Sequence, residues 1–410
     1  MSSPPSTADA AAAAAAAALT AALDAATGAS RPALTSAVLP AVLRAVRRTA
    51  ASLARAHAVA GDGTANAFGD ARLDVDVLAE RHFRAEAAAC AAIAAASSEE
   101  DPVETVKAKT KTGTNSTSTS TSTVTAEGKE GKAGEEEEEE EEEVYAIAFD
   151  PLDGSSIIAP NWAVGSIVGI WAGRSVLQQG SEAPPPQQVA AVLGVYGPRT
   201  TAIVAVRVPG REGAAVCLEV GLSPLSLSPS PSPSPSPPSS SSSPFSNEGI
   251  AHVAKLTLLN GNDNDDNNDD DGDDTAAPKA KAPKYFAPAN LRAAAADPRY
   301  MALVASYIAE RRTLRYSGGL VPDVAHVLVK EGGGGVYLSP VVAGTAEAKL
   351  RRAFELLPVA LVVECAGGRA VDPADGRRIL DRPLLDLNEK GGLVCGTAAE
   401  VERAVAALLG

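Results

Sequence analysis

Apolar and polar positions follow two different spacings along the chain, and segments of the two kinds alternate. Apolar runs bounded by Gly or Pro predict β-strands at residues 144–149, 163–171, 188–196 and 200–208. Stretches rich in Ala, Leu and Arg predict helices at residues 33–57 and 71–89. Several strands in succession favour a mixed sheet, so the expected fold class is α/β (mixed α+β).

The second half of the chain continues this alternation. Apolar residues recur at helical spacing over 300–308, and a second helical stretch is predicted from about residue 346 into the 350s. A strand-like run follows at 359–363, and residues 397–409 are predicted to form the last helix.

Three low-complexity tracts interrupt the pattern. They occupy about residues 102–143 (Ser/Thr and poly-Glu), 223–244 (Pro/Ser) and 262–274 (Asn/Asp). Such compositions bury too little apolar surface to offset the entropy of ordering them. We therefore expect disordered insertions at these three places and a flexible N-terminal segment at residues 1–30.

The acidic balance of the chain comes from two of these tracts. The 410 residues include 51 acidic and 36 basic side chains, a net charge of −15. Nine glutamates at Glu135–Glu143 and eight aspartates between Asp263 and Asp274 supply 17 of the negative charges, so the remaining chain is close to neutral at +2. A fold without clustered positive charge has no electrostatic basis for binding nucleic acid, and that class is excluded.

Cysteine use and hydropathy bear on the compartment. Four cysteines lie far apart without a CxxC pair, which argues against a zinc site or a disulfide framework and favours reduced thiols in an intracellular compartment. No apolar run approaches the roughly 20 residues of a membrane span, so no membrane partner is expected. Residues 1–30 make a weak transit peptide, which leaves cytoplasm and chloroplast stroma as alternatives.

The most informative string is Phe-Asp-Pro-Leu-Asp-Gly-Ser-Ser at residues 149–156, directly after a predicted strand. Asp150 and Asp153 are three residues apart at the strand end, where both can bind one hard divalent cation. The Gly-Ser-Ser turn that follows directs backbone N–H groups and hydroxyls to one point, which suits a phosphate oxygen. An ordinary Asp-Gly turn is the alternative, and the length of the string disfavours it.

With this string and other ordered motifs, the sequence resembles the class I fructose-1,6-bisphosphatase and sedoheptulose-1,7-bisphosphatase family, and more closely its sedoheptulose branch. The resemblance covers most of the chain outside the insertions. Besides the string, the matching segments are residues 66–70, 98–100, 188–191, 196–201, 288–293, 313–319, 321–324 and 348–351.

The resemblance implies a fold and a domain organisation. The fold would be a layered α-β-α-β-α sandwich of the sugar-phosphatase superfamily. A metal-binding phosphatase domain would occupy residues 31–278, and a sugar-phosphate-binding domain residues 279–410. The active site would lie between the two, and the family's assemblies imply a homodimer or homotetramer.

The resemblance also implies a role for each site residue. Two or three Mg²⁺ ions would be bound by Glu99, Asp150, Asp153, Glu355 and the carbonyl of Leu152. Asp76 and Glu100 would position and deprotonate the attacking water. Asp74 is an alternative to Asp76 for this role, but the family spacing selects Asp76. The substrate would be bound by Gly154, Ser155, Ser156, Asn290, Arg315, Tyr316, Lys349 and Arg351. Arg292 lies in the same segment as Asn290, which would line the same pocket.

Two departures from the family pattern affect the expected substrate and metal site. Fructose bisphosphatases carry a tyrosine where this chain has Ser339, and the missing ring leaves room for a seven-carbon sugar. The family's Asp shortly after the Ser-Ser pair is replaced by the Ile157–Pro160 segment, which removes a carboxylate that could orient the metal ligands.

The expected function is therefore Mg²⁺-dependent hydrolysis of the 1-phosphate of sedoheptulose 1,7-bisphosphate, in the carbon-fixation cycle. The alternatives are a fructose-1,6-bisphosphatase, an inositol-phosphatase-like monophosphatase that shares the Asp-Pro-x-Asp-Gly core, and a catalytically silent relative that binds sugar phosphates. Arg315 and Tyr316 argue against the monophosphatase, because a monophosphate has no second phosphate for them to hold. The complete set of acidic residues argues against the silent relative.

Overall fold

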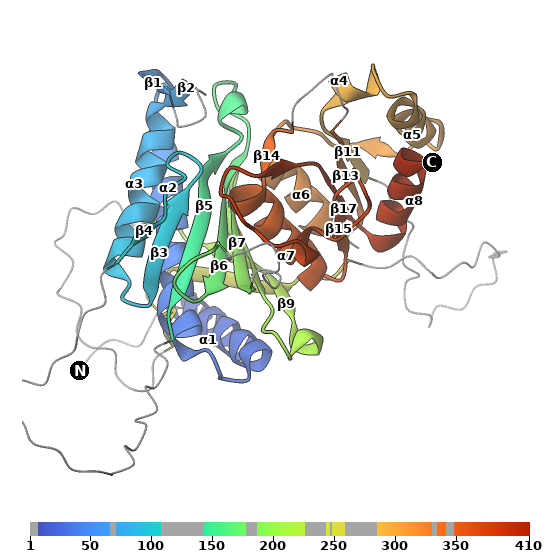
Figure 1. Ribbon diagram of the computed structural model, residues 1–410. Coiled ribbons are helices and arrows are strands. Elements are labelled where there is room, and N and C mark those ends of the chain that lie inside the picture. Colours follow the sequence, from blue (N-terminus) through green and yellow to red (C-terminus); the bar gives the residue numbers. More distant parts are fainter. Residues whose placement is uncertain are drawn as a thin grey trace, which may run out of the picture.

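Two β-sheets with helices between them and on both outer faces make up the structure (Figure 1). This computed structural model describes residues 7–65, 71–107, 143–177, 187–225, 243–246, 248–258, 285–329, 334–341 and 348–410. The motif at residues 66–70 and nearly all of the three low-complexity tracts lie outside these described residues.

The larger sheet has eight strands in the order β10-β9-β8-β7-β6-β5-β3-β4. β3 and β5 are parallel, and the other neighbours are antiparallel. Their sequences are rich in Val, Ile and Ala, which fit a sheet covered on both faces, and all nine residues of β5 are buried. The strands are β3 (Ile93–Ser98), β4 (Thr105–Val106), β5 (Tyr145–Asp153), β6 (Val164–Ala172), β7 (Gln188–Tyr196), β8 (Thr200–Val206), β9 (Val216–Leu222) and β10 (Ile250–Lys255).

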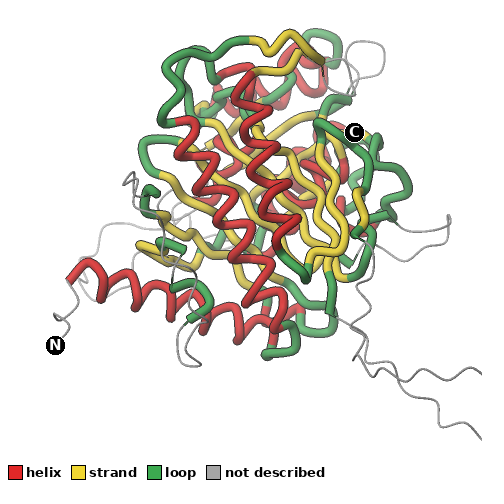
Figure 2. The backbone as a smooth tube through the Cα atoms, turned by 90° about the vertical axis from the view of Figure 1, so that its left-hand side faces the viewer, coloured by secondary structure: helices red, strands yellow, loops and turns green. Residues whose placement is uncertain are grey.

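One outer face of this sheet is covered by three helices (Figure 2). They are α1 (Thr7–Thr27), α2 (Leu39–Leu53), which a π-helical turn η1 (Leu34–Val38) precedes, and α3 (Asp74–Ala89). A short hairpin, β1 (Gly61–Ala65) with β2 (Ala71–Leu73), connects α2 to α3.

Helix α1 corrects the prediction of a flexible segment at residues 1–30. Ala is the strongest helix former, and Leu19 and Leu23, four residues apart, place both side chains on one face. Both leucines are fully buried in the core of the larger sheet. Residues Asp9–Thr27 are also long and apolar enough to cross a membrane by length and composition, which differs from the expectation that no run approaches that length.

The middle layer consists of α6 (Leu320–Val329) and α7 (Leu357–Cys365), whose side chains join the two sheets in one apolar core. A π-helical turn, η4 (Arg352–Leu356), leads into α7. The predicted strand at 359–363 is wrong, because these residues lie inside α7 and are buried on all sides. A short apolar run covered on every side has the same pattern in a helix as in a central strand, and Pro358 begins the helix.

The smaller sheet has five strands in the order β12-β11-β13-β17-β15. Its outer face is covered by α4 (Leu291–Ala294), α5 (Pro298–Ala309) and α8 (Ala398–Leu409) (Figure 1). The strands are β11 (Tyr285–Pro288), β12 (Thr313–Leu314), β13 (Gly335–Ser339), β15 (Arg369–Val371) and β17 (Leu393–Gly396), with a separate pair β14 (Leu350–Arg351) and β16 (Lys390–Gly391). Three short 3₁₀ turns complete the elements: η2 (Ser155–Ile157), η3 (Glu212–Ala214) and η5 (Ile379–Asp381).

The layers therefore run helix, sheet, helix, sheet, helix, which confirms the predicted α-β-α-β-α sandwich and the mixed α/β class. The predicted strands at 144–149, 163–171, 188–196 and 200–208 correspond to β5 to β8, and the first of the predicted helices to η1 and α2. The helix predicted from about residue 346 begins later, because residues 350 and 351 form β14 and the helical turn begins at Arg352. Residues 346 and 347 of this prediction lie outside the described residues.

Candidate active site

Three carboxylates meet where the parallel strands β3 and β5 end. Ser98 and Phe149 are paired in register, and the backbone N–H of Glu99 donates to the Phe149 carbonyl at 3.0 Å. The next residue of β5 is Asp150, so Glu99 and Asp150 leave the sheet at the same point. Glu355 comes from η4, and one carboxylate oxygen from each of the three residues lies within 4.8 Å of the other two. The middle layer thus completes a group that the larger sheet begins.

The electrostatics of this cluster favour a bound cation. Burial raises the pKa of Asp150 well above its usual range, and the charges of Glu99, Asp153 and Glu355 raise it further. Burial and the charge of Glu99 likewise raise the pKa of Glu355. A set of oxygen donors without sulfur or nitrogen suits a hard divalent ion. The residues present fit the metal that the family resemblance implies.

Asp153 lines the same cavity but makes a different set of contacts. Its two carboxylate oxygens accept hydrogen bonds from the first backbone N–H groups of α6, those of Leu320 at 3.0 Å and Val321 at 2.6 Å. Burial raises its pKa to about 6, although the two N–H groups oppose the rise. Asp153 therefore links the larger sheet to the middle layer at the edge of the cavity.

Asp76 and Asp74 stand two residues apart at the start of α3 but in different surroundings. Asp76 is buried, accepts a hydrogen bond from the Leu73 backbone N–H at 2.9 Å, and lines the cavity of about 530 Å³ that also contains Glu99, Glu100 and Asp150. Asp74 is exposed and bonds the backbone N–H groups of Ala60 and Val75. The structure thus brings Asp76 and Glu100 to the metal cluster.

This contrast supports a paired prediction. Asp76→Asn keeps the size of the side chain but removes the proton acceptor, and we expect it to lower kcat about 100-fold. Asp74→Asn removes the same charge two residues away, and we expect it to change kcat by less than about twofold. Phosphate release at saturating substrate measures both variants. Equal loss in the two would show that the charge at the start of α3, and not the position of Asp76, affects the rate.

The turn after β5 provides donors for an anion. Gly154 has φ +87°, a left-handed conformation that glycine adopts without strain, and it redirects the chain into η2. Ser155 and Ser156 follow, and both line the cavity with the carboxylates. Leu152 lines it as well, and its backbone N–H donates to Asp150 at 3.0 Å.

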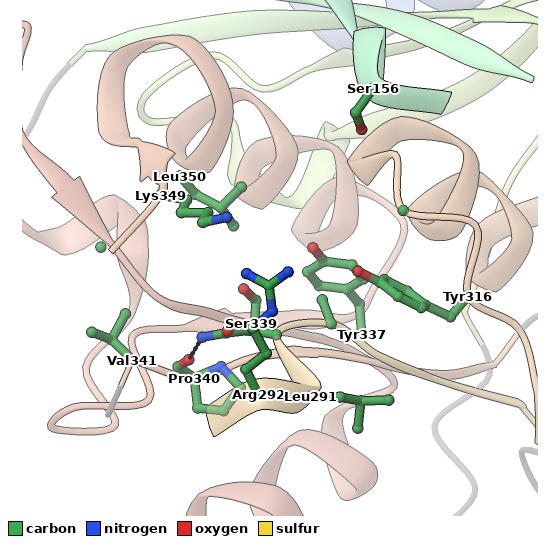
Figure 3. A pocket seen from close by; sticks show the side chains of 14 residues that line it. Ser156, Leu291, Arg292, Tyr316, Tyr337, Ser339, Pro340, Val341, Lys349 and Leu350 are labelled. Carbon is green, nitrogen blue, oxygen red and sulfur yellow. Dashed lines mark hydrogen bonds between the residues drawn. The ribbon is translucent and has the colours of Figure 1, made fainter. Parts of the chain in front are cut away.

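A second cavity of about 510 Å³ adjoins the first, and Ser156 lines both. Besides Ser156, its lining includes three more residues predicted to bind substrate, Asn290, Tyr316 and Lys349. Figure 3 shows Ser156 on one side of it, Lys349 on another, and the tyrosines Tyr316 and Tyr337 together. Among the lining residues there are two cations and no carboxylate, whereas the first cavity is lined by six carboxylates and no cation.

The two predicted arginines differ in position. Arg351 is buried, and its guanidinium bonds Glu99 while its backbone N–H donates to Glu355 at 2.6 Å, so it belongs to the metal cluster. Arg315 is exposed; it donates to the Leu314 carbonyl at 2.9 Å and lies over the Tyr285 ring at 5.6 Å. It does not line either cavity.

Several residues at the site have no signal in the sequence taken alone. Tyr337 lines the second cavity from β13, a strand whose partner residues are far apart in sequence. Behind the Asp-Pro-Leu-Asp turn, Ser166 bonds both the Pro151 carbonyl at 2.6 Å and the Tyr196 hydroxyl at 2.7 Å. Ala159, by contrast, lies in the segment that the sequence already marks as a departure from the family pattern, and it lines the first cavity.

Comparisons with known proteins identify the family of this chain. The model of the fructose-1,6-bisphosphatase N-terminal domain matches residues 114–222, and that of the C-terminal domain matches residues 279–409. A crystal structure of a protein assigned as a sedoheptulose-1,7-bisphosphatase, from Toxoplasma gondii, is 32% identical and superimposes with a TM-score of 0.64 over 91% of this chain and 93% of that one. The chain belongs to the fructose-1,6-bisphosphatase family. Fructose-1,6-bisphosphatase from Leishmania major, at 21% identity and a TM-score of 0.62, has the same fold.

Relatives from both branches of the fructose-1,6-bisphosphatase family match. Chloroplastic sedoheptulose-1,7-bisphosphatase from Triticum aestivum is 33% identical over 63% of this chain and 51% of its own length, and that from Spinacia oleracea 32% over 63% and 52%. Class 1 fructose-1,6-bisphosphatase from Syntrophotalea carbinolica is 31% identical over 63% of each chain. The chain spans about half the length of the two plant relatives.

Proposed function

We propose that this chain is a Mg²⁺-dependent sugar bisphosphatase that releases the 1-phosphate of sedoheptulose 1,7-bisphosphate, giving sedoheptulose 7-phosphate and phosphate. The observation that carries the proposal is the opposite charge of two adjoining cavities that share Ser156. A phosphate that reacts beside a metal would occupy the carboxylate cavity, and a second anionic group would occupy the cationic one. A substrate with a phosphate at each end fits both.

The metal would be held by Glu99, Asp150 and Glu355, with Asp153 and the Leu152 carbonyl at the same cavity. When bound, Mg²⁺ would neutralise phosphoryl charge and lower the pKa of the attacking water. Two or three such ions agree with the family resemblance and with the number of carboxylates.

The remaining chemistry is assigned to side chains of this chain. A water molecule attacks phosphorus in line with the bond to the sugar C1 oxygen, and Asp76 or Glu100 takes its proton. Ser155 and Ser156 would hold the phosphoryl oxygens, and Arg351 would balance the charge that develops on them. The phosphorus–oxygen bond to the sugar breaks as the new one forms, and the sugar oxygen leaves with a proton from the site.

Two features favour the seven-carbon substrate over fructose 1,6-bisphosphate. Ser339 lines the cationic cavity where a larger side chain would shorten it, and the sedoheptulose-1,7-bisphosphatases among the relatives are 32% and 33% identical. Fructose-1,6-bisphosphatase remains the second candidate, because class 1 enzymes of that name match at 31%. The chloroplastic location of the plant relatives supports a role in carbon fixation.

Assembly into a homodimer or homotetramer is also proposed. Arg315 lies outside both cavities of its own subunit, directly after the edge strand β12 and next to Leu314, which is 52% exposed. From that position it is available to a neighbouring subunit.

Phosphate release from three substrates at stepped Mg²⁺ concentrations tests the proposal. Sedoheptulose 1,7-bisphosphate is expected to have the highest kcat/KM, fructose 1,6-bisphosphate a lower one, and inositol 1-phosphate none that is measurable. Equal or faster turnover of the fructose substrate would favour the second candidate. No release from any substrate at any Mg²⁺ concentration would overturn the assignment as a phosphatase.

A further inference from the structure

Arg292 lines the cationic cavity, and no carboxylate is found among the described residues of that lining. The Arg292 side chain makes no hydrogen bond or ion pair with any described residue. The other cation among the described lining residues, Lys349, enters from the segment before β14. Figure 3 shows the Arg292 guanidinium directed into the cavity, where Lys349 is also found. Two uncompensated cations that face one space favour an anionic ligand there.

The backbone that carries Arg292 is held in place at several points. Strands β11 and β13 are parallel, with Pro288 opposite Leu338, so the chain leaves both strands at the same edge of the sheet. Asn290 follows in a left-handed conformation (φ +52°), and its side-chain amide donates to the Pro340 carbonyl at 2.9 Å. The Tyr300 hydroxyl donates to the Ala289 carbonyl at 2.7 Å. The turn that carries Arg292 is therefore held in place by two hydrogen bonds, one to Pro340 and one from Tyr300.

The Asn290–Pro340 hydrogen bond also makes Ser339 a neighbour of this turn, since Ser339 directly precedes Pro340. Ser339 ends β13, and it lines the cavity together with Arg292. Its side chain is short, and Figure 3 shows both the Ser339 hydroxyl and the Arg292 guanidinium on the cavity side. A bulky residue at 339 would occupy space that the guanidinium now uses.

We propose that Arg292 binds the distal phosphate of the substrate and that the small side chain of Ser339 keeps open the space this guanidinium needs. The proposal rests on the proposed function and names the residues that select a bisphosphate. Arg292 can offer paired N–H donors to two phosphate oxygens, which a Lys cannot. Arg315 does not line this cavity within its own subunit, so the contacts to the distal phosphate from the same subunit are assigned to Arg292 and Lys349.

The first test compares substrates with and without a distal phosphate in Arg292→Ala. KM for sedoheptulose 1,7-bisphosphate is expected to rise about 10- to 100-fold with kcat within about threefold, because hydrogen bonds to charged groups contribute on this scale. Turnover of a sugar 1-phosphate, fructose 1-phosphate, is expected to keep its wild-type kcat/KM. Arg292→Lys is expected to recover only part of the loss. Equal loss on both substrates, or an unchanged KM for the bisphosphate, would overturn the proposal.

The matched control is Arg299→Ala. Its side chain is 56% exposed on α5, pairs with Asp297, and lines neither cavity, so both substrates are expected to behave as in wild type. Calorimetric binding of sedoheptulose 7-phosphate gives a readout that does not need catalysis. If the wild-type protein binds sedoheptulose 7-phosphate and Arg292→Ala weakens this binding at least tenfold, the inference is supported even where no substrate is hydrolysed. The absence of hydrolysis would overturn the proposed function alone.

The second test concerns Ser339. Ser339→Tyr is expected to raise KM for the bisphosphate as Arg292→Ala does, and Ser339→Ala, which stays small, to raise it far less. In the double variant Arg292→Ala/Ser339→Tyr, the two effects on KM are not expected to multiply, because both remove the same contact. Multiplicative effects would show that Ser339 acts independently of Arg292, and this part of the proposal would be abandoned.

Discussion

Replacing Asp150 with Asn is expected to lower kcat/KM by at least about a thousandfold, which is about 4 kcal/mol of transition-state stabilisation. Asp150 is the central member of the metal cluster: it is buried, and its carboxylate lies within 4.8 Å of those of Glu99 and Glu355. Asn has almost the same shape but no charge, so the site loses one anionic ligand while the turn after β5 keeps its conformation. Phosphate release at saturating Mg²⁺ measures the effect.

The same variant is expected to fold at least as stably as wild type when Mg²⁺ is removed. In the metal-free protein, burial and the neighbouring carboxylates disfavour the charged form of Asp150, as its raised pKa indicates. Asn removes that unfavourable charge. Thermal unfolding in EDTA and in Mg²⁺ is therefore expected to show a smaller stabilisation by Mg²⁺ in Asp150→Asn than in wild type.

Asp101→Asn provides the control for both measurements. Its side chain is 62% exposed, directly follows the acidic pair Glu99 and Glu100, and lies outside the cavity lining. Wild-type activity and wild-type stabilisation by Mg²⁺ are expected. An Asp150→Asn protein that retained a tenth or more of the activity would exclude Asp150 as an essential ligand.

Features that depend on short stretches of sequence could be predicted well. The strand predicted at 188–196 coincides with β7, because an almost continuous apolar run ends there at Gly197 and Pro198. The string at 149–156 predicts two carboxylates and an anion-binding turn at one strand end, and the structure places them at the first cavity. In both cases the signal is local: a short apolar run that ends at Gly and Pro in one, and a turn that needs Gly154 in the other.

Features that depend on contacts between distant residues could not be predicted from local patterns. Residues 359–363 have the apolar pattern of a buried strand, and only their position between two sheets shows them to be helical. The Ala-rich start of the chain looks weakly hydrophobic until Leu19 and Leu23 are seen against the larger sheet. Arg292 and Ser339 are 47 positions apart, and the parallel pairing of β11 with β13 brings them to one cavity.

The metal-free protein is expected to lose stability as the pH rises from about 4 to about 7. The pKa of Asp153 in the folded state is about 6, against an ordinary value of 3.8, because burial disfavours its charge. The folded state therefore binds a proton more tightly than the unfolded state, and the resulting stability is fully present below pH 3.8 and lost as the pH rises through 6. The difference corresponds to about 3 kcal/mol for this residue alone. The raised pKa values of Asp150 and Glu355 act in the same direction.

Denaturant unfolding in EDTA at several pH values between 4 and 8 measures this loss, and Asp153→Asn isolates the share of Asp153. Asn does not titrate, but it also offers one acceptor oxygen instead of two to the N–H groups of Leu320 and Val321, so its absolute stability is lowered at every pH. The informative quantity is how much the free energy of unfolding falls between pH 4 and pH 8. This fall is expected to be about 3 kcal/mol smaller in the variant than in wild type. Saturating Mg²⁺ is expected to flatten the wild-type slope as well, because a bound cation favours the ionised carboxylates. Identical slopes for wild type and Asp153→Asn in EDTA would show that the pKa of Asp153 is the same in the folded and the unfolded state. Its hydrogen bonds with the N–H groups of α6 would then offset the effect of burial.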